Sequence, residues 1–264
     1  MDFKLPARAE NSNKGTFGKI LNISGSKYMW GAAYLSSLSA LTIGAGFVAL
    51  ASEESVLSRI HAPEIVLCPL SQIEEINPTV LLIGCGLSTS DKAKEIFNSV
   101  IPSKIPTVID ADGLNILAGN DEILRDNDII LTPHPKEASR LLNCSLDEIL
   151  ENMELSAKKI CEKYNCITVL KSHRTIVTDG EKTYYNTTGN SALAKAGSGD
   201  VLAGMIAGLL AQGSTPYEAS CLSVYLHGLA GDLAKNDLTE YGVLATDTIR
   251  YIPCAIKKST CNNI

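Results

Sequence analysis

The stretch Val80-Leu81-Leu82-Ile83-Gly84-Cys85-Gly86 carries a short aliphatic run directly into a glycine-rich turn. A strand whose residues are all apolar, instead of alternating with polar ones, is typical of a parallel sheet covered by helices on both faces. Ile65-Val66-Leu67 and Ile129-Ile130-Leu131 have the same character. Further strands are expected at 19–23, 47–50, 107–110, 167–170 and 175–178, and the last turns at Asp179-Gly180 into an antiparallel hairpin with 182–185.

Helical segments alternate with these strands. We expect a helix of small residues at 31–43 and an almost wholly apolar helix that begins near Asp200. This alternation predicts an α/β fold with a central, mostly parallel sheet and helices on both faces. No linker or repeat divides the chain, so residues 1–264 are predicted to form a single domain. The tail after Ile256, with Lys257-Lys258, is predicted to be a frayed end.

Composition limits the partners and the location. Of the 264 residues 45% are hydrophobic but only 5% aromatic, so small aliphatic side chains must fill the core. The net charge of −6 argues against a nucleic-acid partner, because phosphate neutralisation needs clustered Lys and Arg. The longest apolar stretches, such as 201–211, are too short to span a bilayer, and no apolar signal core follows the N-terminus. We therefore expect a soluble, cytoplasmic protein without a membrane partner.

The eight cysteines point the same way. None forms a Cys-x-x-Cys pair, and several lie inside apolar runs. Reduced, mostly buried thiols in a cytoplasmic protein are the better interpretation. The four histidines show no ligand spacing with the cysteines, so no zinc or other protein-bound metal site is predicted.

The strongest chemical motif is Ala194-Lys195-Ala196-Gly197-Ser198-Gly199-Asp200, a glycine-rich turn that opens the apolar helix. Glycines leave room for a phosphate, and the unpaired amides at a helix N-terminus bind anions. Asp200 is placed to accept a proton from an attacking hydroxyl. The alternative is structural: Asp200 is only a helix cap and the glycines only make a turn, an arrangement that is common.

Two further clusters follow predicted strands. His134 lies in Thr132-Pro133-His134-Pro135, where two prolines stiffen a loop at the carboxyl end of a strand, the usual ligand edge of such sheets. The plainer alternative is a histidine that caps a neighbouring carbonyl. Asp110, Asp112 and Asn115 follow another strand and could hold hydroxyls, water or Mg²⁺. Turn and cap chemistry is the alternative, above all for Asp110.

Two weaker sites follow the same logic. Gly84-Cys85-Gly86 would let a ligand approach the backbone, although a lone Gly-x-Gly is weak support. In Lys171-Ser172-His173-Arg174-Thr175, Lys171 and Arg174 could contact phosphate or bracket an adenine. A bare hairpin turn is the alternative for that segment.

Taken together and in order, these segments resemble the ADP/ATP-dependent NAD(P)H-hydrate dehydratase family on the ribokinase-like fold. The resemblance runs nearly end to end, and its most specific parts are the loop at 131–137 and the Gly-Ser-Gly-Asp turn. It also takes in the segments at 14–18, 24–26, 31–33, 84–87, 110–115, 169–171 and 186–190.

The resemblance implies repair of hydrated nicotinamide cofactors. A nucleotide phosphorylates the C6 hydroxyl of the (S)-hydrate, and phosphate is then eliminated to restore NADH or NADPH. Asp200 would activate that hydroxyl, and Mg²⁺ would bridge the phosphates. The substrate contacts implied are Ala32, Gly86, Asn115, His134 and Asp200. The nucleotide contacts implied are Lys171, Ser172, His173, Arg174, Thr175, Lys195, Ala196, Gly197, Ser198 and Gly199.

The same resemblance favours ADP over ATP as donor and a homo-oligomer, such as a tetramer. Cys85 stands where proline is common, and Ser172 where glycine is common, without removing a group the chemistry needs. We expect no epimerase domain, so a separate epimerase or spontaneous epimerisation would supply the (S)-form. Two alternatives stay open: a kinase of this fold for a vitamin precursor such as hydroxyethylthiazole, and a non-catalytic nucleotide sensor or scaffold.

Overall fold

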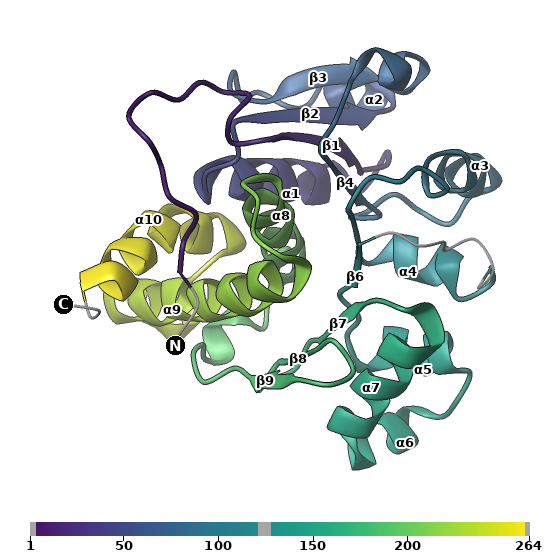
Figure 1. The fold of residues 1–264 in the computed structure, drawn as a ribbon, viewed down its shortest axis with the longest axis vertical. Coiled ribbons are helices and arrows are strands. Elements are labelled where there is room, and N and C mark those ends of the chain that lie inside the picture. Colours follow the sequence, from purple (N-terminus) through teal and green to yellow (C-terminus); the bar gives the residue numbers. More distant parts are fainter. Residues whose placement is uncertain (1–3, 121–127, 262–264) are drawn as a thin grey trace.

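Nine strands form one continuous sheet at the centre of the molecule (Figure 1). The structure, a computed structural model, describes residues 4–120 and 128–261. The strands are β1 (Lys19–Ile23), β2 (Phe47–Ser52), β3 (Val66–Pro69), β4 (Val80–Ile83), β5 (Thr107–Ile109), β6 (Ile129–Leu131), β7 (Ile167–Leu170), β8 (Ile176–Thr178) and β9 (Thr183–Tyr185).

The strand order is β3-β2-β1-β4-β5-β6-β7-β8-β9. Every pair from β3 to β7 is parallel, with Ile23 of β1 opposite Ala51 of β2 on one side and Ile83 of β4 on the other. The pairs β7–β8 and β8–β9 are antiparallel. This arrangement confirms the predicted mostly parallel sheet and its terminal hairpin.

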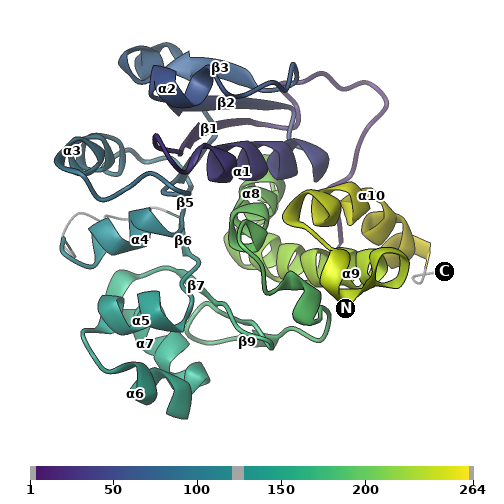
Figure 2. The same cartoon turned by 180° about the vertical axis from the view of Figure 1, so that it is seen from behind.

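Helices cover both faces of the sheet (Figures 1 and 2). Alternate residues of each strand point to opposite faces: Leu82 and Val108 pack with α1, α8, α9 and α10, whereas Ile83 and Ile109 pack with the helices of the other face. The helices are α1 (Trp30–Thr42), α2 (Glu54–Leu57), α3 (Asp91–Val100), α4 (Asp112–Leu117), α5 (Pro135–Leu142), α6 (Leu146–Glu151), α7 (Met153–Tyr164), α8 (Ser198–Ala211), α9 (Pro216–Gly242) and α10 (Ala245–Cys261), with short 3₁₀ turns η1 (Leu70–Glu75) and η3 (Ser191–Leu193).

Helix α8 lies at the centre of one layer, and each residue from Val201 to Leu210 is buried. A Cβ atom on Gly204 would lie 2.1 Å from the Ser36 carbonyl oxygen of α1, and one on Gly208 would lie 2.2 Å from Ile43 Cγ2. The two helices therefore approach as closely as their backbones allow, which confirms the prediction that these glycines serve close packing. None of the described helices is both long enough and apolar enough to cross a membrane.

The C-terminal prediction was wrong. Residues after Ile256 are not frayed but continue α10 to Cys261, because Ile252 and Ala255 anchor that helix in the core. The two lysines that indicated a frayed end fall in its last turns, where positive charge complements the helix dipole. The long helix α9 also follows here, and Thr239 interrupts its helical geometry at φ 64° and ψ 163°.

Candidate active site

The sheet topology creates a crevice at the carboxyl ends of the strands. Strand β1 lies between β2 and β4, so the chain leaves it toward one edge of the sheet and later returns on its other side. Ligands of open α/β sheets bind at such a switch point. Cys85 follows β4, Asp110 follows β5 and Lys171 follows β7, so three functional groups meet at this end of the sheet.

The N-terminus of α8 points into the same crevice. Gly197 is its N-cap at φ 93°, and a Cβ there would lie 2.4 Å from Leu35 Cδ1, so only glycine fits this turn. The Ser198 amide donates to the Lys195 carbonyl oxygen at 3.3 Å. Among the described residues, the amides of Gly199 and Asp200 have no protein acceptor. Together with the helix dipole, these two amides form an anion-binding position.

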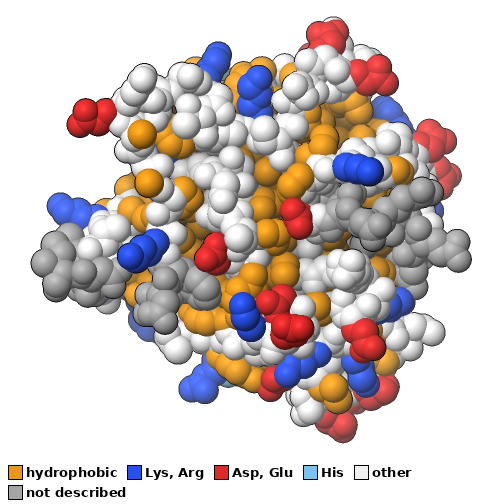
Figure 3. All heavy atoms as spheres, viewed as in Figure 1, with side chains coloured by type: hydrophobic (Ala, Val, Ile, Leu, Met, Phe, Trp, Pro, Cys, Tyr) orange, Lys and Arg blue, Asp and Glu red, His pale blue; other side chains and the backbone are white. Residues whose placement is uncertain are grey.

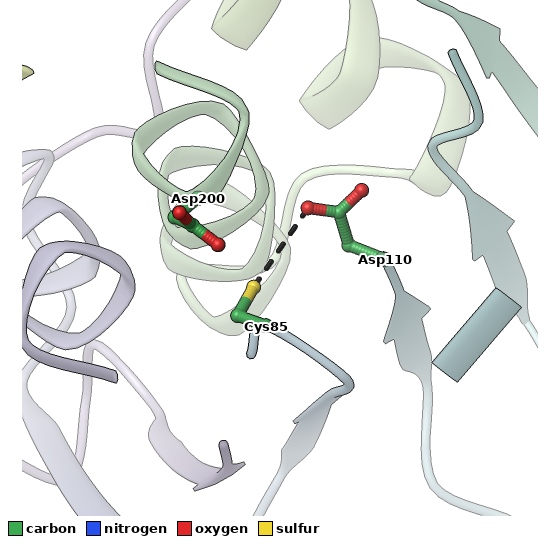
Figure 4. Close-up of side chains that lie close together, drawn as sticks. All are labelled: Cys85, Asp110 and Asp200. Carbon is green, nitrogen blue, oxygen red and sulfur yellow. Dashed lines mark hydrogen bonds between the residues drawn. The ribbon is translucent and has the colours of Figure 1, made fainter. Parts of the chain in front are cut away.

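Asp200 lies at the third position of α8 and faces Cys85 and Asp110 (Figure 4). One ligand atom from each of the three residues lies within 4.8 Å of the others. Burial, followed by the negative charge of Asp110, raises the pKa of Asp200 to about 7. The N-cap is Gly197 and not Asp200, so capping does not explain this carboxyl group. A carboxylate with that pKa can take up and release a proton near neutral pH.

Lys171 holds the neighbouring carboxylates. Its Nζ donates to Asp110 Oδ1 at 2.6 Å and lies 3.9 Å from Glu137 Oε2. Thr132 also donates to Asp110 Oδ1, at 2.7 Å. Burial alone lowers the pKa of Lys171, but the charges of Asp110 and Glu137 outweigh it, and the net pKa is raised. Asp110 is 2% exposed and ion-paired, so turn chemistry does not account for it.

His134 caps α5 in a way the sequence did not show. Its Nδ1 accepts from the amides of Lys136 and Glu137, at 3.1 and 3.2 Å, while Glu137 Oε2 accepts from the His134 amide at 2.8 Å. The capping alternative is thus right about capping, although the ring accepts from amides and does not bond a carbonyl. Because Nδ1 accepts, the proton of the neutral ring sits on Nε2, 3.3 Å from Glu137 Oε1.

The two members of this capping pair have shifted pKa values. Burial, followed by the positive charge of Lys171, lowers the pKa of His134. Burial also raises the pKa of Glu137 to about 7, against the opposing charge of Lys171. His134 therefore presents a neutral ring at the crevice, with a readily protonated carboxyl group behind it.

A cavity of about 780 Å³ adjoins this centre. Its walls include most of the predicted nucleotide contacts, namely Lys171, Ser172, His173, Thr175, Lys195, Ala196, Ser198 and Gly199, together with His134. Gly197 and Arg174 do not line it. The Lys195 ammonium group donates to the Tyr241 carbonyl oxygen at 2.6 Å, so it ties the turn to the end of α9.

Several cavity residues were missed from the sequence. His227 of α9 is one, and its Nε2 lies 3.3 Å from Ser198 Oγ. Burial lowers the pKa of His227 to about 4, so the ring is neutral. Nothing in the middle of an apolar helix indicated this role. The loop at 186–190 also lines the cavity, where Asp232 accepts from the Gly189 amide at 3.0 Å and from Asn190 Nδ2 at 2.7 Å.

The remaining predicted substrate contacts lie around the crevice. A Cβ on Gly86 would lie 2.9 Å from that of Ala32, so the glycine turn packs directly on α1. Asn115 lies on α4, and its Oδ1 accepts from Arg140 at 2.7 Å. Asp112 accepts from the Ser88 amide at 2.7 Å, a turn-stabilising contact that agrees with the alternative given for this cluster. Neither Asn115 nor Asp112 lines the large cavity.

The donors at this centre suit Mg²⁺ better than a softer metal. Burial raises the pKa of the Cys85 thiol, so it stays protonated and does not act as a thiolate ligand. Asp110 Oδ1 is engaged by Lys171 and Thr132, whereas Oδ2 has only the distant thiol, at 3.8 Å. One carboxylate oxygen beside an anion-binding turn fits the way Mg²⁺ binds with phosphates and water.

A larger cavity, of about 870 Å³, lies at the opposite end of the sheet. Ile129 and Ile167, the first residues of β6 and β7, line it. It therefore opens at the amino ends of the strands, away from Asp200 and the free amides. The smaller cavity at the carboxyl ends is the candidate active site.

Residues 20–254 match the NAD(P)H-hydrate dehydratase family. The chain belongs to this family. It is 39% identical over 87% of its length to the ADP-dependent (S)-NAD(P)H-hydrate dehydratase of Neisseria meningitidis, of which 81% is covered. It is 36% identical over 94% of its length to the bifunctional NAD(P)H-hydrate repair enzyme of Coxiella burnetii, of which 52% is covered. The chain thus spans about half the length of the bifunctional relatives it matches.

A solved structure shows the same architecture. The ADP/ATP-dependent NAD(P)H-hydrate dehydratase of Bacillus subtilis, co-crystallised with ATP and Mg²⁺, superimposes with a TM-score of 0.89 at 31% identity. The match covers 96% of this chain and 94% of that one. The predicted ribokinase-like fold is thereby confirmed.

Proposed function

We propose that this protein is a hydro-lyase that dehydrates the (S)-epimer of hydrated NADH and NADPH at the expense of ADP. The observation that carries the proposal is Asp200, a buried carboxyl group with a pKa of about 7 beside two free amides at the start of α8. Membership of the NAD(P)H-hydrate dehydratase family supports it. So does the nearly full-length relation to an enzyme named as ADP-dependent.

The first step is phosphoryl transfer. Asp200 takes the proton of the C6 hydroxyl, whose oxygen attacks the terminal phosphorus of ADP, and AMP leaves. The amides of Gly199 and Asp200 stabilise the charge on the transferring group, because they already point to where it develops. A carboxylate held beside an anion-binding turn is suited to this task and to no purely structural one.

The second step is elimination. The bond between C6 and the phosphorylated oxygen breaks, phosphate departs with that oxygen, and C5 releases a proton to restore the double bond. The sum is hydrate plus ADP giving NAD(P)H, AMP and phosphate. Asp200 gives up its acquired proton to solvent or to phosphate before the next cycle, which its pKa permits near pH 7.

Mg²⁺ would be held by Asp110 Oδ2 and by the phosphates, where it would neutralise their charge. The groups at the mouth of the crevice, Ala32, Gly86, His134 and Asn115, would contact the hydrated dinucleotide. The nucleotide would occupy the cavity walled by Lys171–Thr175 and the turn at 195–199. Lys171 keeps Asp110 ionised by its charge, and the Nε2–H of His134 is a donor for the substrate.

We further propose that residues 1–264 act as one domain, in the cytoplasm, as a homo-oligomer such as a tetramer. Large apolar side chains on the surface support association: Tyr28 is 83% exposed, Tyr241 90% and Leu244 56%. Figure 3 shows hydrophobic side chains exposed across the middle of one face. Light scattering on the purified chain gives the number of copies.

The decisive assay mixes the protein with Mg²⁺, hydrated NADH or NADPH, and either ADP or ATP in parallel. Recovery of the reduced-nicotinamide absorbance, one AMP and one phosphate for each NADH formed, supports the proposal. Faster recovery with ADP than with ATP supports ADP as the donor. Phosphorylation of hydroxyethylthiazole without any absorbance recovery would establish the alternative, a vitamin-precursor kinase.

A further inference from the structure

A second cavity opens at the same end of the sheet as the active site. Its volume is about 280 Å³, and it lies among the loops that follow β1, β2 and β4, close to α2 and α3 (Figure 1). Gly25, Glu53 and Leu87 contribute from these three loops, and Lys92 and Ile96 contribute from α3. None of its lining residues also lines the nucleotide cavity. The crevice is therefore flanked by two separate spaces.

The small cavity begins where the candidate substrate contacts end. Gly86 packs on α1 through Met29 and Ala32, with a Cβ placed 2.7 and 2.9 Å from theirs. Tyr28 and Leu87, the sequence neighbours of Met29 and Gly86, line the cavity. A ligand held over Gly86 can thus extend into this space without entering the nucleotide cavity.

The cavity has the composition of a nucleoside site. Leu87, Ile96 and Tyr28 supply apolar surface for a base, and the serine hydroxyls supply polar contacts. Its charged pair is formed by Glu53 Oε1 and Lys92 Nζ, 2.9 Å apart. Both side chains are partly exposed, at 43% and 63%, so both can reach a ligand.

Glu53 directly follows Ser52, the last residue of β2, and β2 is the neighbour of β1. In dinucleotide sites of other α/β sheets, an acidic residue in this region accepts from the ribose 2′-hydroxyl, whereas a basic residue accommodates a 2′-phosphate. A carboxylate accepts hydrogen bonds from ribose hydroxyls and repels a phosphate dianion. Lys92 is neutralised by Glu53, which leaves the carboxylate as the deciding group.

We propose that this cavity binds the adenosine end of the hydrated dinucleotide and that Glu53 selects a 2′-hydroxyl over a 2′-phosphate, so that hydrated NADH is preferred to hydrated NADPH. The inference rests on the proposed function, because it assigns a subsite to that substrate. Glu53 acts as a specificity residue and takes no part in proton transfer at C6.

The test compares kcat/KM for the two hydrates in the wild type and in Glu53→Gln, Lys92→Gln and Glu54→Gln. Glu53→Gln should lower the NADH-to-NADPH ratio at least tenfold, because Lys92 is then free to pair with the 2′-phosphate. Lys92→Gln should raise the ratio or leave it unchanged. Glu54 is exposed and does not line the cavity, so Glu54→Gln should behave as the wild type.

The hydrate of reduced nicotinamide mononucleotide is the internal control, since it lacks the adenosine end. Its kcat/KM should not change in Glu53→Gln. An unchanged NADH-to-NADPH ratio in Glu53→Gln would overturn the inference, and so would an equal loss on the mononucleotide.

A binding measurement separates this inference from the proposed function. Dissociation constants of NADH and NADPH, titrated by nicotinamide fluorescence, should show the same change of ratio in Glu53→Gln. If no hydrate is dehydrated but the binding ratio still shifts tenfold, the proposed function fails and the subsite stands. If dehydration is normal and the ratio is unmoved, the subsite fails and the function stands.

Discussion

The ammonium group of Lys171 lies 2.6 Å from the Asp110 carboxylate, although the two residues are 61 positions apart in the chain. They follow β7 and β5, and parallel strands bring these two ends together. The pair is nearly buried, with side-chain exposures of 19% and 2%. Asp110 in turn raises the pKa of Asp200, while Lys171 lowers it, so this pair adjusts the carboxyl group beside the anion-binding turn.

Replacing Lys171 with Met should therefore move the pH dependence of catalysis. Without the cation, the pKa of Asp200 rises above about 7, and the acidic limb of the kcat/KM profile moves to higher pH. Loss of one member of a buried pair also costs stability, about 3–5 kcal/mol. The profile is measured between pH 5.5 and 9.

Two further variants control for structural damage. Lys182→Met removes an exposed lysine and should change neither property. The double variant Lys171→Met/Asp110→Asn removes both charges, so it should recover part of the lost stability without recovering activity. An acidic limb that stays in place in Lys171→Met would contradict the coupling.

Asp200→Asn should abolish turnover, leave ADP binding largely intact and stabilise the protein at alkaline pH. The pKa of Asp200 is raised from 3.8 to about 7 in the folded state. Between those values the folded state binds more protons than the unfolded state, so this carboxyl group's contribution to stability falls as pH rises. Above pH 7 its ionised form is a net destabilising group, which the amide removes.

The measurement is the free energy of unfolding by urea at pH 8 and pH 4.5, with ADP binding followed by calorimetry. At pH 8 the variant should be more stable by about 1–3 kcal/mol, and at pH 4.5 the difference should nearly vanish. Equal stability at both pH values would mean that the pKa of Asp200 is not raised. Undiminished turnover would remove it from the mechanism.

The contact between Ser198 Oγ and His227 Nε2, at 3.3 Å, should matter for nucleotide affinity. If the neutral imidazole donates to Ser198 Oγ, the serine proton is free to point at a phosphate oxygen. Ser198→Ala and His227→Asn should each raise the KM for ADP about three- to tenfold, the value of one neutral hydrogen bond.

A double-mutant cycle checks that these two residues act together. The double variant should show no greater loss than either single one. Because the pKa of His227 is lowered to about 4, the effect on KM should be the same from pH 6 to pH 9. Fully additive losses would show that the two side chains act separately.

Gly204→Ala tests the close packing of α8 on α1, which fixes the position of the anion-binding turn. The added Cβ would lie 2.1 Å from both the Ser36 carbonyl oxygen and Ser39 Oγ, so the helices must separate. We expect a loss of about 3 kcal/mol or more in the free energy of unfolding. Gly31→Ala is the matched control, since no atom lies within 4 Å of its Cβ position, and urea unfolding should show it unimpaired.

The sequence predicted the central layer well. Strands such as β4 and β6 are short aliphatic runs, and burial on both faces leaves that pattern no other favourable structure. Helix α8 was predicted from its apolar run, but its start is Ser198, two residues before Asp200. The fate of the last helix was not predictable, because Ile252 and Ala255 are buried by partners far away in the chain.

The site was predicted in part for the same reason. Residues next to a strand end or in the glycine turn, such as Asp110 and Asp200, carry a local signal. Their mutual arrangement does not, since the ion pair of Lys171 with Asp110 depends on strand order. His227 comes from the middle of a helix and carries no local signal.

Isotopic labelling tests the central claim most directly. The substrate is (S)-NADH hydrate with ¹⁸O in its C6 hydroxyl, incubated with Mg²⁺, ADP and the protein. If that oxygen attacks phosphorus beside Asp200 and leaves as phosphate, mass spectrometry will find one ¹⁸O in each phosphate released. Label recovered in water, with unlabelled phosphate, would contradict phosphoryl transfer to the substrate.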